Sequence, residues 1–290
     1  MNCANSNSPI NISSSDNVQI CNIYCSYNHK YNDSSCTATH NSNFLQLSYD
    51  TGSVPPVTFN DEQYNVRTIY IFSPSIHTYN GTTADAEMLI FHDGAGKKLI
   101  VSVPLVSSNN SIAQSSTILY NIISTFSNVV NVSASNDSQL IHVSNYNLEY
   151  FIPDSPYYFY TGGSPFSPCD NTYSFIVFDQ TKSPVAISSA TLSILNNLIS
   201  PSGISPVIRM DYYYHSTPPN GSNPGADDKI YIECNPTDES GETMYQPDTT
   251  SSSSSLMPLP DVDIMNNPIL NLIVGIGLSY AFLKMVSKVL

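Results

Sequence analysis

The sequence predicts a mainly β (α+β) fold, and three observations support this class. The chain of 290 residues contains 20 Tyr and 11 Phe, together with many Val, Ile, Ser, Thr and Asn. Aromatic and β-branched residues favour strands, whereas Ala, Glu, Lys and Arg, which favour helices, are few. Several short runs also alternate apolar and polar residues between turn residues. The length suits one large domain with a tail, or two small domains.

The charge of the chain limits the classes of molecule that it can bind. Charged residues make up 11% of the sequence, and the formal net charge is −14. Only Arg67 and Arg209 are arginines, and no cluster of lysines occurs. Nucleic acids and sulfated glycans are bound through clustered Lys and Arg, so the composition argues against both partners. Polar uncharged side chains, chiefly Asn and Ser, are expected to cover the surface.

The N-terminal third is expected to contain loop and strand segments. Residues 13–43 are rich in Ser, Asn and Cys, and we interpret them as a loop with a short strand near residues 18–24. Residues 44–49 alternate apolar and polar side chains, which predicts a strand.

Residues 69–92 form the most informative stretch, which reads IYIFSPSIHTYNGTTADAEMLIFH. It predicts a strand, a turn and a second strand, because successive strand side chains point to opposite faces. Ser73, Pro74 and Ser75 end the first run, and an Asn-Gly pair at Asn80 and Gly81 is a strong turn signal.

The second half continues with a buried strand and two helices. Residues 99–106 form a continuous apolar run, which is typical of a strand buried on both faces. Residues 112–126 carry apolar side chains at helical spacing, which predicts a helix. A second helix is predicted at residues 190–199, with Ser188 or Ser189 as its N-cap.

The central stretch resembles the α-carbonic anhydrases. In that family the first strand carries an H-x-H pair, the bacterial-type members continue with S-P-S-E-H-T-x-N-G, and the second strand reads E-x-H-x-x-H. The resemblance implies that two histidines of the first strand and one of the second would hold zinc. The residues at those three positions here are Tyr70, Phe72 and Leu89. Positions that support the site without binding the metal are occupied by His77, Glu87 and His92.

The resemblance therefore predicts that the chain keeps the family's fold but lacks the zinc-dependent reaction. Catalytic zinc uses three protein ligands and a water, and Tyr, Phe and Leu supply no usable set. The family's Glu after S-P-S is Ile76 here, and Phe166 or Ser167 falls where the family has a Thr that orients the zinc-bound hydroxide. Without the ion no bound water is activated as a nucleophile. We expect no enzyme activity, no cofactor, and an apolar core in place of the metal.

The resemblance extends over roughly residues 8–200, in several segments that keep the family's order. These segments include S-P-I-N-I at residues 8–12, F-L-Q-L-S-Y-D at residues 44–50 and Y-S-F-I-V-F at residues 173–178. The fold that it implies is a large, mostly antiparallel, twisted central sheet with a few peripheral helices.

Six cysteines leave the redox state open. They are Cys3, Cys21, Cys25, Cys36, Cys169 and Cys234. The N-terminus has neither the basic nor the apolar region of a signal peptide, so reduced thiols are the default expectation. A zinc site of Cys21, Cys25 and Cys36 with His29 and His40 fits no common spacing well. The resemblance implies instead that Cys169 could pair with Cys21 or Cys25, as secreted members often do.

The C-terminal tail predicts a membrane anchor behind a linker. Residues 249–263 are rich in Ser and Pro, which is typical of a flexible linker. Residues 269–283 carry no charge, and a spanning helix needs about twenty mostly apolar residues. With flanking lysines near the interface, residues 264–290 meet that length. The apolar side chains expected in lipid are Ile269, Leu272, Ile273, Val274, Ile276, Leu278, Phe282 and Leu283.

These expectations combine into a domain at residues 1–248, a linker at residues 249–263 and an anchor at residues 264–290. The layout resembles the virion-membrane surface proteins of large DNA viruses, of the poxvirus cell-surface-binding type. It implies a non-catalytic structural protein that is made in the cytoplasm, is anchored in the virion membrane and contacts capsid proteins. One alternative is attachment to a glycan or protein receptor of the host cell. Another is an enzyme with a remodelled pocket.

Overall fold

The computed structural model describes residues 7–13, 18–21, 24–109, 113–132, 136–166, 172–182 and 184–219. The chain divides into two compact units, Met1–Lys229 and Ile230–Leu290, and every described residue belongs to the first. Within the described residues no helix is long and apolar enough to cross a membrane. The predicted linker and anchor lie outside the described residues.

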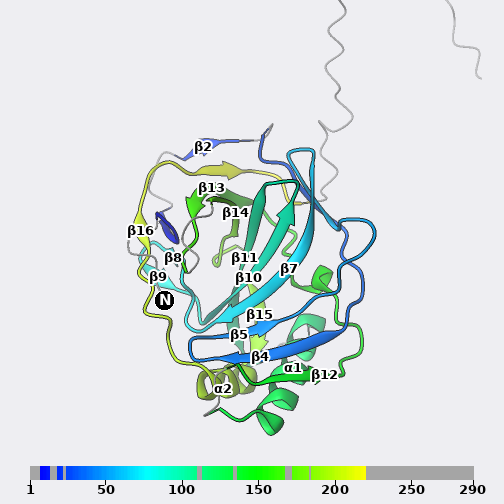
Figure 1. Ribbon diagram of the computed structural model, residues 1–290. Helices are drawn as coiled ribbons and strands as arrows, with labels where there is room; N and C mark the ends of the chain where they lie inside the picture. The colour runs from blue at the N-terminus through cyan, green and yellow to red at the C-terminus, as the bar shows by residue number, and fades with distance from the viewer. Residues whose placement is uncertain are drawn as a thin grey trace, which may run out of the picture. The chain divides into compact units, whose positions relative to one another are not determined.

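The N-terminal half consists of strands (Figure 1). In chain order these are β1 (Ile10–Ile12), β2 (Gln19–Ile20), β3 (Tyr27–His29), β4 (Cys36–Asn41), β5 (Phe44–Leu47), β6 (Val57–Phe59), β7 (Glu62–Phe72), β8 (Thr78–Tyr79), β9 (Thr82–Thr83), β10 (Ala86–Gly94) and β11 (Lys98–Ser108).

The second half adds the helices. Its elements are α1 (Gln114–Val129), β12 (Ser138–Ile141), a 3₁₀ helix η1 (Leu148–Phe151), β13 (Tyr157–Gly163), β14 (Thr172–Phe178), β15 (Val185–Ser188), α2 (Ser189–Leu198), β16 (Val207–Ile208) and β17 (Tyr213–His215). Both predicted helices are therefore present. Ser188 caps α2 by accepting a hydrogen bond from the Thr191 amide.

One large sheet organises the described domain, which confirms the mainly β prediction. Its main path runs β12-β4-β5-β7-β10-β11-β14-β13-β17-β2, and β15, β3 and β6 attach to its sides. Most neighbours are antiparallel, as expected, but β11–β14, β11–β15 and β17–β2 are parallel, so the sheet is mixed. A small second sheet has the order β16-β1-β8-β9.

The two faces of the large sheet carry separate cores, because successive strand residues point to opposite sides. On one face α1 and α2 cover a helix-side core that includes Ile71, Met88, Ile90, Val101, Ile122 and Leu195. On the other face lies a site-side core that includes Phe72, Leu89, Phe91, Ile100, Tyr160 and Phe175. Of the predicted buried run at residues 99–106, residues 99–105 are buried because successive side chains point to opposite faces of the sheet, and Val106 is half-buried.

The predicted turn after the first central strand is a small hairpin of its own. β8 and β9 pair through Tyr79 and Thr82, and Asn80 and Gly81 between them both have positive φ, 51° and 78°. Two such residues in succession suit a tight hairpin, and an Asn-Gly pair adopts them at low cost. The hairpin places the preceding residue, His77, close to the second central strand.

The interpretation of residues 13–43 as a loop with one short strand was incomplete. β2 lies within the strand predicted near residues 18–24, but β3 and β4 were missed. β4 occupies six residues of this region and alternates buried and half-buried side chains. Its inward residues are Cys36, Ala38 and His40, which do not resemble the Val and Ile of an ordinary strand. The strand signal is weak because small and polar side chains pack against the sheet there.

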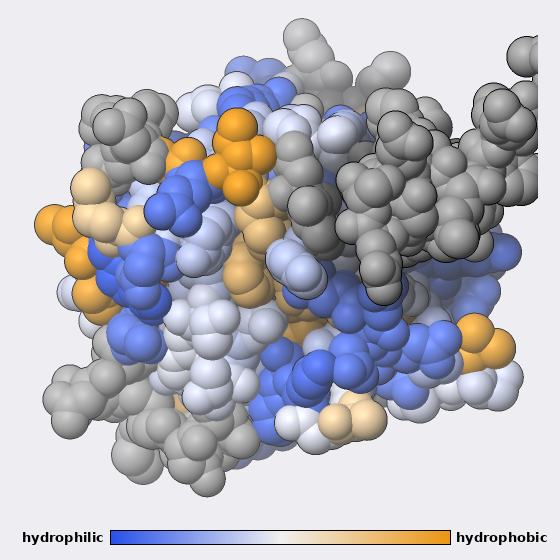
Figure 2. Space-filling model, turned by 90° about the horizontal axis from the view of Figure 1, so that it is seen from above, coloured by the Kyte–Doolittle hydropathy of each residue, from blue (hydrophilic) through white to orange (hydrophobic). Residues whose placement is uncertain are grey.

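The surface agrees with the low charge of the sequence. On the face in Figure 2, polar residues predominate and the hydrophobic ones form small separate patches. Scattered apolar residues of this kind are ordinary on a folded domain.

One buried histidine couples the helix-side core to pH. His92 is fully buried in β10, and its Nε2 lies 2.9 Å from the hydroxyl of Tyr31, which itself lies 3.0 Å from the Tyr27 hydroxyl. Burial lowers the pKa of His92 to about 3. An unfolded histidine has a pKa of about 6.5, so the unfolded chain binds this proton first as the pH falls.

We therefore expect stability to fall as the pH drops from about 6.5 towards 3, by at most about 1.4 kcal/mol per pH unit from this residue. His92→Gln should remove that part of the slope, and the exposed His142→Gln is the matched control. Urea unfolding between pH 7 and pH 4 measures the slope. An unchanged slope in His92→Gln would contradict the assignment.

Candidate functional site

The central strands bring the predicted site residues onto one face of the sheet. β7 and β10 are antiparallel, and their register sets Leu89 opposite Tyr70 and Glu87 opposite Phe72. Residues directly opposite one another share a face, so all four side chains point into the site-side core. The register shifts between Phe91 and His92, where a β-bulge changes the phase of β7.

Aromatic rings surround Tyr70 and Phe72. The Tyr70 ring centroid lies 4.6 Å from that of Phe44, 5.0 Å from that of Phe91 and 5.5 Å from that of Phe166. Phe72 lies 5.5 Å from Phe44 and 5.9 Å from Phe166. These separations are those of packed aromatic pairs. We call these five residues the aromatic cluster.

Two basic side chains lie over the border of the aromatic cluster. The guanidinium of Arg67 lies 5.3 Å from the Phe91 ring centroid, and the Lys98 ammonium lies 5.8 Å from that of Tyr173. Both also approach the Asp93 carboxylate, at 3.7 Å and 3.5 Å. Exposed ion pairs of this kind contribute little, so these cations chiefly cover aromatic faces.

The residues at the three predicted metal positions do not fit zinc. Leu89 is fully buried and has no donor atom, and Phe72 offers only a ring. Burial raises the pKa of Tyr70, so its phenol keeps its proton and is a poor ligand. No group of three His, Cys, Asp or Glu side chains with metal-binding geometry occurs within the part of the chain that the structure describes.

The two neighbouring positions from the sequence analysis are also apolar. Ile76 is buried, and only its backbone takes part in polar contacts, through an N–H that donates to Glu87 Oε2 at 2.7 Å. Phe166 belongs to the aromatic cluster, whereas Ser167 lies outside the described residues. Neither Ile76 nor Phe166 has a side chain that accepts or donates a proton.

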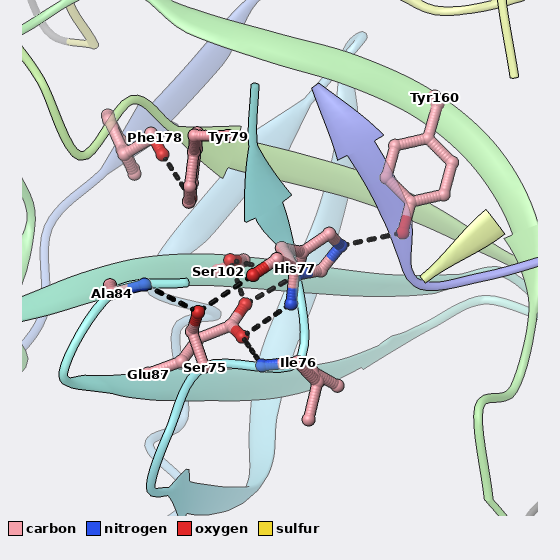
Figure 3. Close-up of polar contacts among 9 residues, drawn as sticks. All are labelled: Ser75, Ile76, His77, Tyr79, Ala84, Glu87, Ser102, Tyr160 and Phe178. Atoms are coloured by element: carbon pink, nitrogen blue, oxygen red, sulfur yellow. Dashed lines mark hydrogen bonds and ion pairs between the residues drawn. The ribbon is translucent and has the colours of Figure 1, made fainter. Parts of the chain in front are cut away.

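A polar network persists beneath this apolar surface (Figure 3). The fully buried Glu87 carboxylate accepts from the backbone N–H groups of Ile76 and His77 through Oε2, at 2.7 and 3.0 Å. Its Oε1 lies 2.5 Å from His77 Nδ1 and accepts from Ser102 Oγ at 2.5 Å. His77 Nε2 lies 2.8 Å from the Tyr160 hydroxyl. The network thus joins the loop before β8 to β10, β11 and β13.

Opposing effects set the ionisation of Glu87. Burial by itself raises the pKa of the carboxyl group, but the electrostatic interaction with His77 and the hydrogen bonds from His77 and Ser102 outweigh it. The net result is a pKa below the ordinary value, so Glu87 is an ionised buried group. Its partners compensate the charge, which is the condition for burying one.

The structure separates the three supporting positions that the sequence grouped together. His77 and Glu87 are in direct contact, whereas His92 points to the helix-side core and contacts Tyr31. Sequence reasoning also missed Ser102 and Tyr160. A single hydroxyl residue within the buried run at residues 99–105 was the available signal for Ser102, but nothing near Tyr160 in the sequence indicated its contact with His77.

The cysteine expectations need correction. Cys21 and Cys25 form a disulfide with their Cα atoms 5.8 Å apart, so they are neither reduced thiols nor available to pair with Cys169, which lies outside the described residues. His29 contacts Glu149, and Cys36 is buried as a free thiol. These side chains have partners other than a shared metal.

Glu87→Gln should lower the free energy of unfolding by about 3–5 kcal/mol, because the amide nitrogen of Gln cannot accept the hydrogen bonds that one carboxylate oxygen accepts, which leaves buried donors without a partner. Ser102→Ala removes one donor and should cost only about 1 kcal/mol. Because the folded pKa of Glu87 is lowered, its contribution is present above about pH 4.3 and is lost as the pH falls through the folded value. Urea unfolding at pH 7 and pH 3 tests both points. Equal losses in the two variants would contradict this account.

Comparison with known proteins agrees with this geometry. Residues 2–214 match the family model for eukaryotic-type carbonic anhydrase. No curated protein matches the chain at the significance required.

Solved structures share the fold at low sequence identity. Dioscorin complexed with ascorbate has a TM-score of 0.60 and 19% identity, and the match covers 74% of this chain and 87% of dioscorin. The α-carbonic anhydrase of Thermovibrio ammonificans, in complex with sulfanilamide, has a TM-score of 0.58 and 18% identity, with 73% and 88% covered. Carbonic anhydrase Cah3 of Chlamydomonas reinhardtii, in complex with acetazolamide, has 0.59 and 14%, with 73% and 91% covered. By its family match and its fold, this chain belongs to the eukaryotic-type carbonic anhydrase family.

Proposed function

We propose that this protein is a non-catalytic member of its family. The observation that carries the proposal is the packing of Tyr70 and Phe72 into the aromatic cluster, with Leu89 buried opposite Tyr70. At the positions that the family resemblance assigns to zinc ligands, these side chains supply ring and alkyl surface. Zinc requires nitrogen, sulfur or oxygen donors in a tetrahedral set.

The absence of suitable donors bears directly on the reaction. In a zinc hydratase the metal lowers the pKa of a bound water to about 7 and so creates the nucleophile. The family's Glu next to that water is also replaced, since Ile76 carries no titratable atom. We therefore assign no catalytic step to this site.

The purified full chain should contain less than about 0.1 zinc per molecule and should hydrate CO₂ no faster than buffer, because the metal has no ligand set. Metal analysis by mass spectrometry and stopped-flow hydration measure these quantities. The variant Tyr70→His/Phe72→His/Leu89→His restores three donors on one face and should bind about one zinc per chain. Stoichiometric zinc in the unaltered chain, removable by a chelator, would overturn the proposal.

The role we assign in place of catalysis is structural. The protein would be a membrane-anchored component of a large DNA virus, with the carbonic-anhydrase-like domain contacting capsid or other virion proteins. Support comes from the sequence layout of domain, Ser/Pro-rich linker and apolar tail, and from the weakly charged, Tyr-rich composition, which suits protein–protein contact. The Cys21–Cys25 disulfide supports exposure to an oxidising environment, such as a virion surface.

Deletion of residues 264–290 should release the protein from membranes, because the remaining chain lacks an apolar run of about twenty residues. Flotation of cell membranes or virions on a density gradient measures the association. A deletion of the linker residues 249–255 is the matched control and should leave the protein in the floating fraction. Flotation of the form that lacks residues 264–290 would contradict the predicted anchor.

A further inference from the structure

The end of the large sheet at β12 is an edge that is open to strand pairing. β12 is the terminal strand of the main path, and among the described residues it pairs only with β4. At the opposite end, β2 is two residues long, which makes it a poor template for another strand. Ser138–Ile141 is thus the longer of the two terminal strands on this path.

The hydrogen-bond pattern shows which backbone groups point outward. The His40 N–H donates to the Asp137 carbonyl at 2.8 Å, so Asp137 directs its carbonyl towards β4. In an antiparallel ladder, alternate residues turn their groups to the same neighbour. Gln139 therefore shares the orientation of Asp137, whereas Ser138 and Leu140 direct their N–H and C=O groups away from β4. Both of these residues are exposed.

β12 lacks the features that protect most edge strands. Natural edges are commonly protected by Lys, Pro, a bulge or an inward-pointing charge. The sequence of β12 is SQLI, its pairing with β4 is regular from Ser138 to Ile141, and the Leu140 side chain is 58% exposed. The bulge at Asn136 and Asp137, which both bond to His40, lies before this stretch. An exposed leucine on an open edge favours contact with another strand.

The charge distribution indicates which molecule would supply the partner strand. The chain carries a net charge of −14, so two copies repel each other across most surfaces. β12, β4, β5 and α1 contain no Asp, Glu, Lys or Arg. Asp137 borders the edge, but its carboxylate accepts from the Asn131 N–H and from Gln139 Nε2. This end of the domain therefore allows two copies to approach without like charges facing each other.

We propose that β12 pairs with β12 of a second copy of this chain, which would join the two large sheets into one across a two-fold axis. Antiparallel pairing is required, because a two-fold axis reverses the strand direction. Outward-facing residues must pair with outward-facing residues, and among the registers that satisfy this condition the one that sets Leu140 opposite Leu140 of the second copy buries the most apolar surface. The two exposed leucines then share a face and shield each other from water.

The first test is the mass of the purified full chain in mild detergent, by sedimentation equilibrium over a range of concentrations. The subunit mass is 31.7 kDa, and we expect a species of twice that mass. Leu140→Lys places like charges opposite each other and should raise the dimer dissociation constant roughly tenfold or more. Ile20→Lys, at a 69% exposed position on β2, is the matched control and should leave the dimer intact. A monomer at all concentrations, or a dimer equally stable in Leu140→Lys, would overturn the proposal.

The second test reports the register directly. Opposed Cα atoms in a hydrogen-bonded antiparallel pair lie about 5.5 Å apart, within the range that a disulfide bridges. Leu140→Cys should therefore form a cross-linked dimer under mild oxidation, whereas Val54→Cys, at a 68% exposed position, should not. Equal cross-linking of the two variants, or none in Leu140→Cys, would refute the pairing. Neither test depends on zinc content or on the membrane anchor, so this inference and the proposed function fail separately.

Discussion

The buried carboxylate of Glu87 is the constraint on which the centre of the domain depends. A charge without water must have its partners in place, and Glu87 takes them from backbone N–H groups, an imidazole and a hydroxyl. Those donors belong to β11 and to the loop that leads into β8. The loop must therefore return to β10 at one position, which also sets where His77 meets Tyr160 on β13.

The polar network around Glu87 and the aromatic cluster lie on the same face of the sheet, and they differ in which amino-acid substitutions they tolerate. The network stabilises the arrangement of four segments, so losing one member leaves a buried charge without compensation. The three neighbouring positions that the family resemblance assigns to zinc ligands have no comparable polar partners to satisfy. Apolar groups of suitable size can fill that space and add to the core, which explains how a family scaffold is compatible with Tyr70, Phe72 and Leu89.

In the proposed role, this scaffold serves contact with other molecules. The low charge, the abundance of Tyr, Asn and Ser, and the disulfide between Cys21 and Cys25 support that proposal. The unprotected β12 edge offers a specific place for such contact, since edges of this type are normally avoided in monomeric proteins. The proposed contact edge and the positions that the family resemblance assigns to the metal therefore lie in different parts of the same sheet.

The sequence by itself determined the class of fold, both helices and the central strands. These features depend on local periodicity, on turn residues such as Asn80 and Gly81, and on the order of short motifs, all of which are written along the chain. The tertiary structure decided which distant groups meet. Ser102 and Tyr160 join Glu87 and His77 only because strand order and register bring four segments together, and His92 departs from them because its side chain points to the opposite face. Leu140 lies at the end of the large sheet for the same reason: strand order and register follow from packing, which no single stretch of sequence encodes.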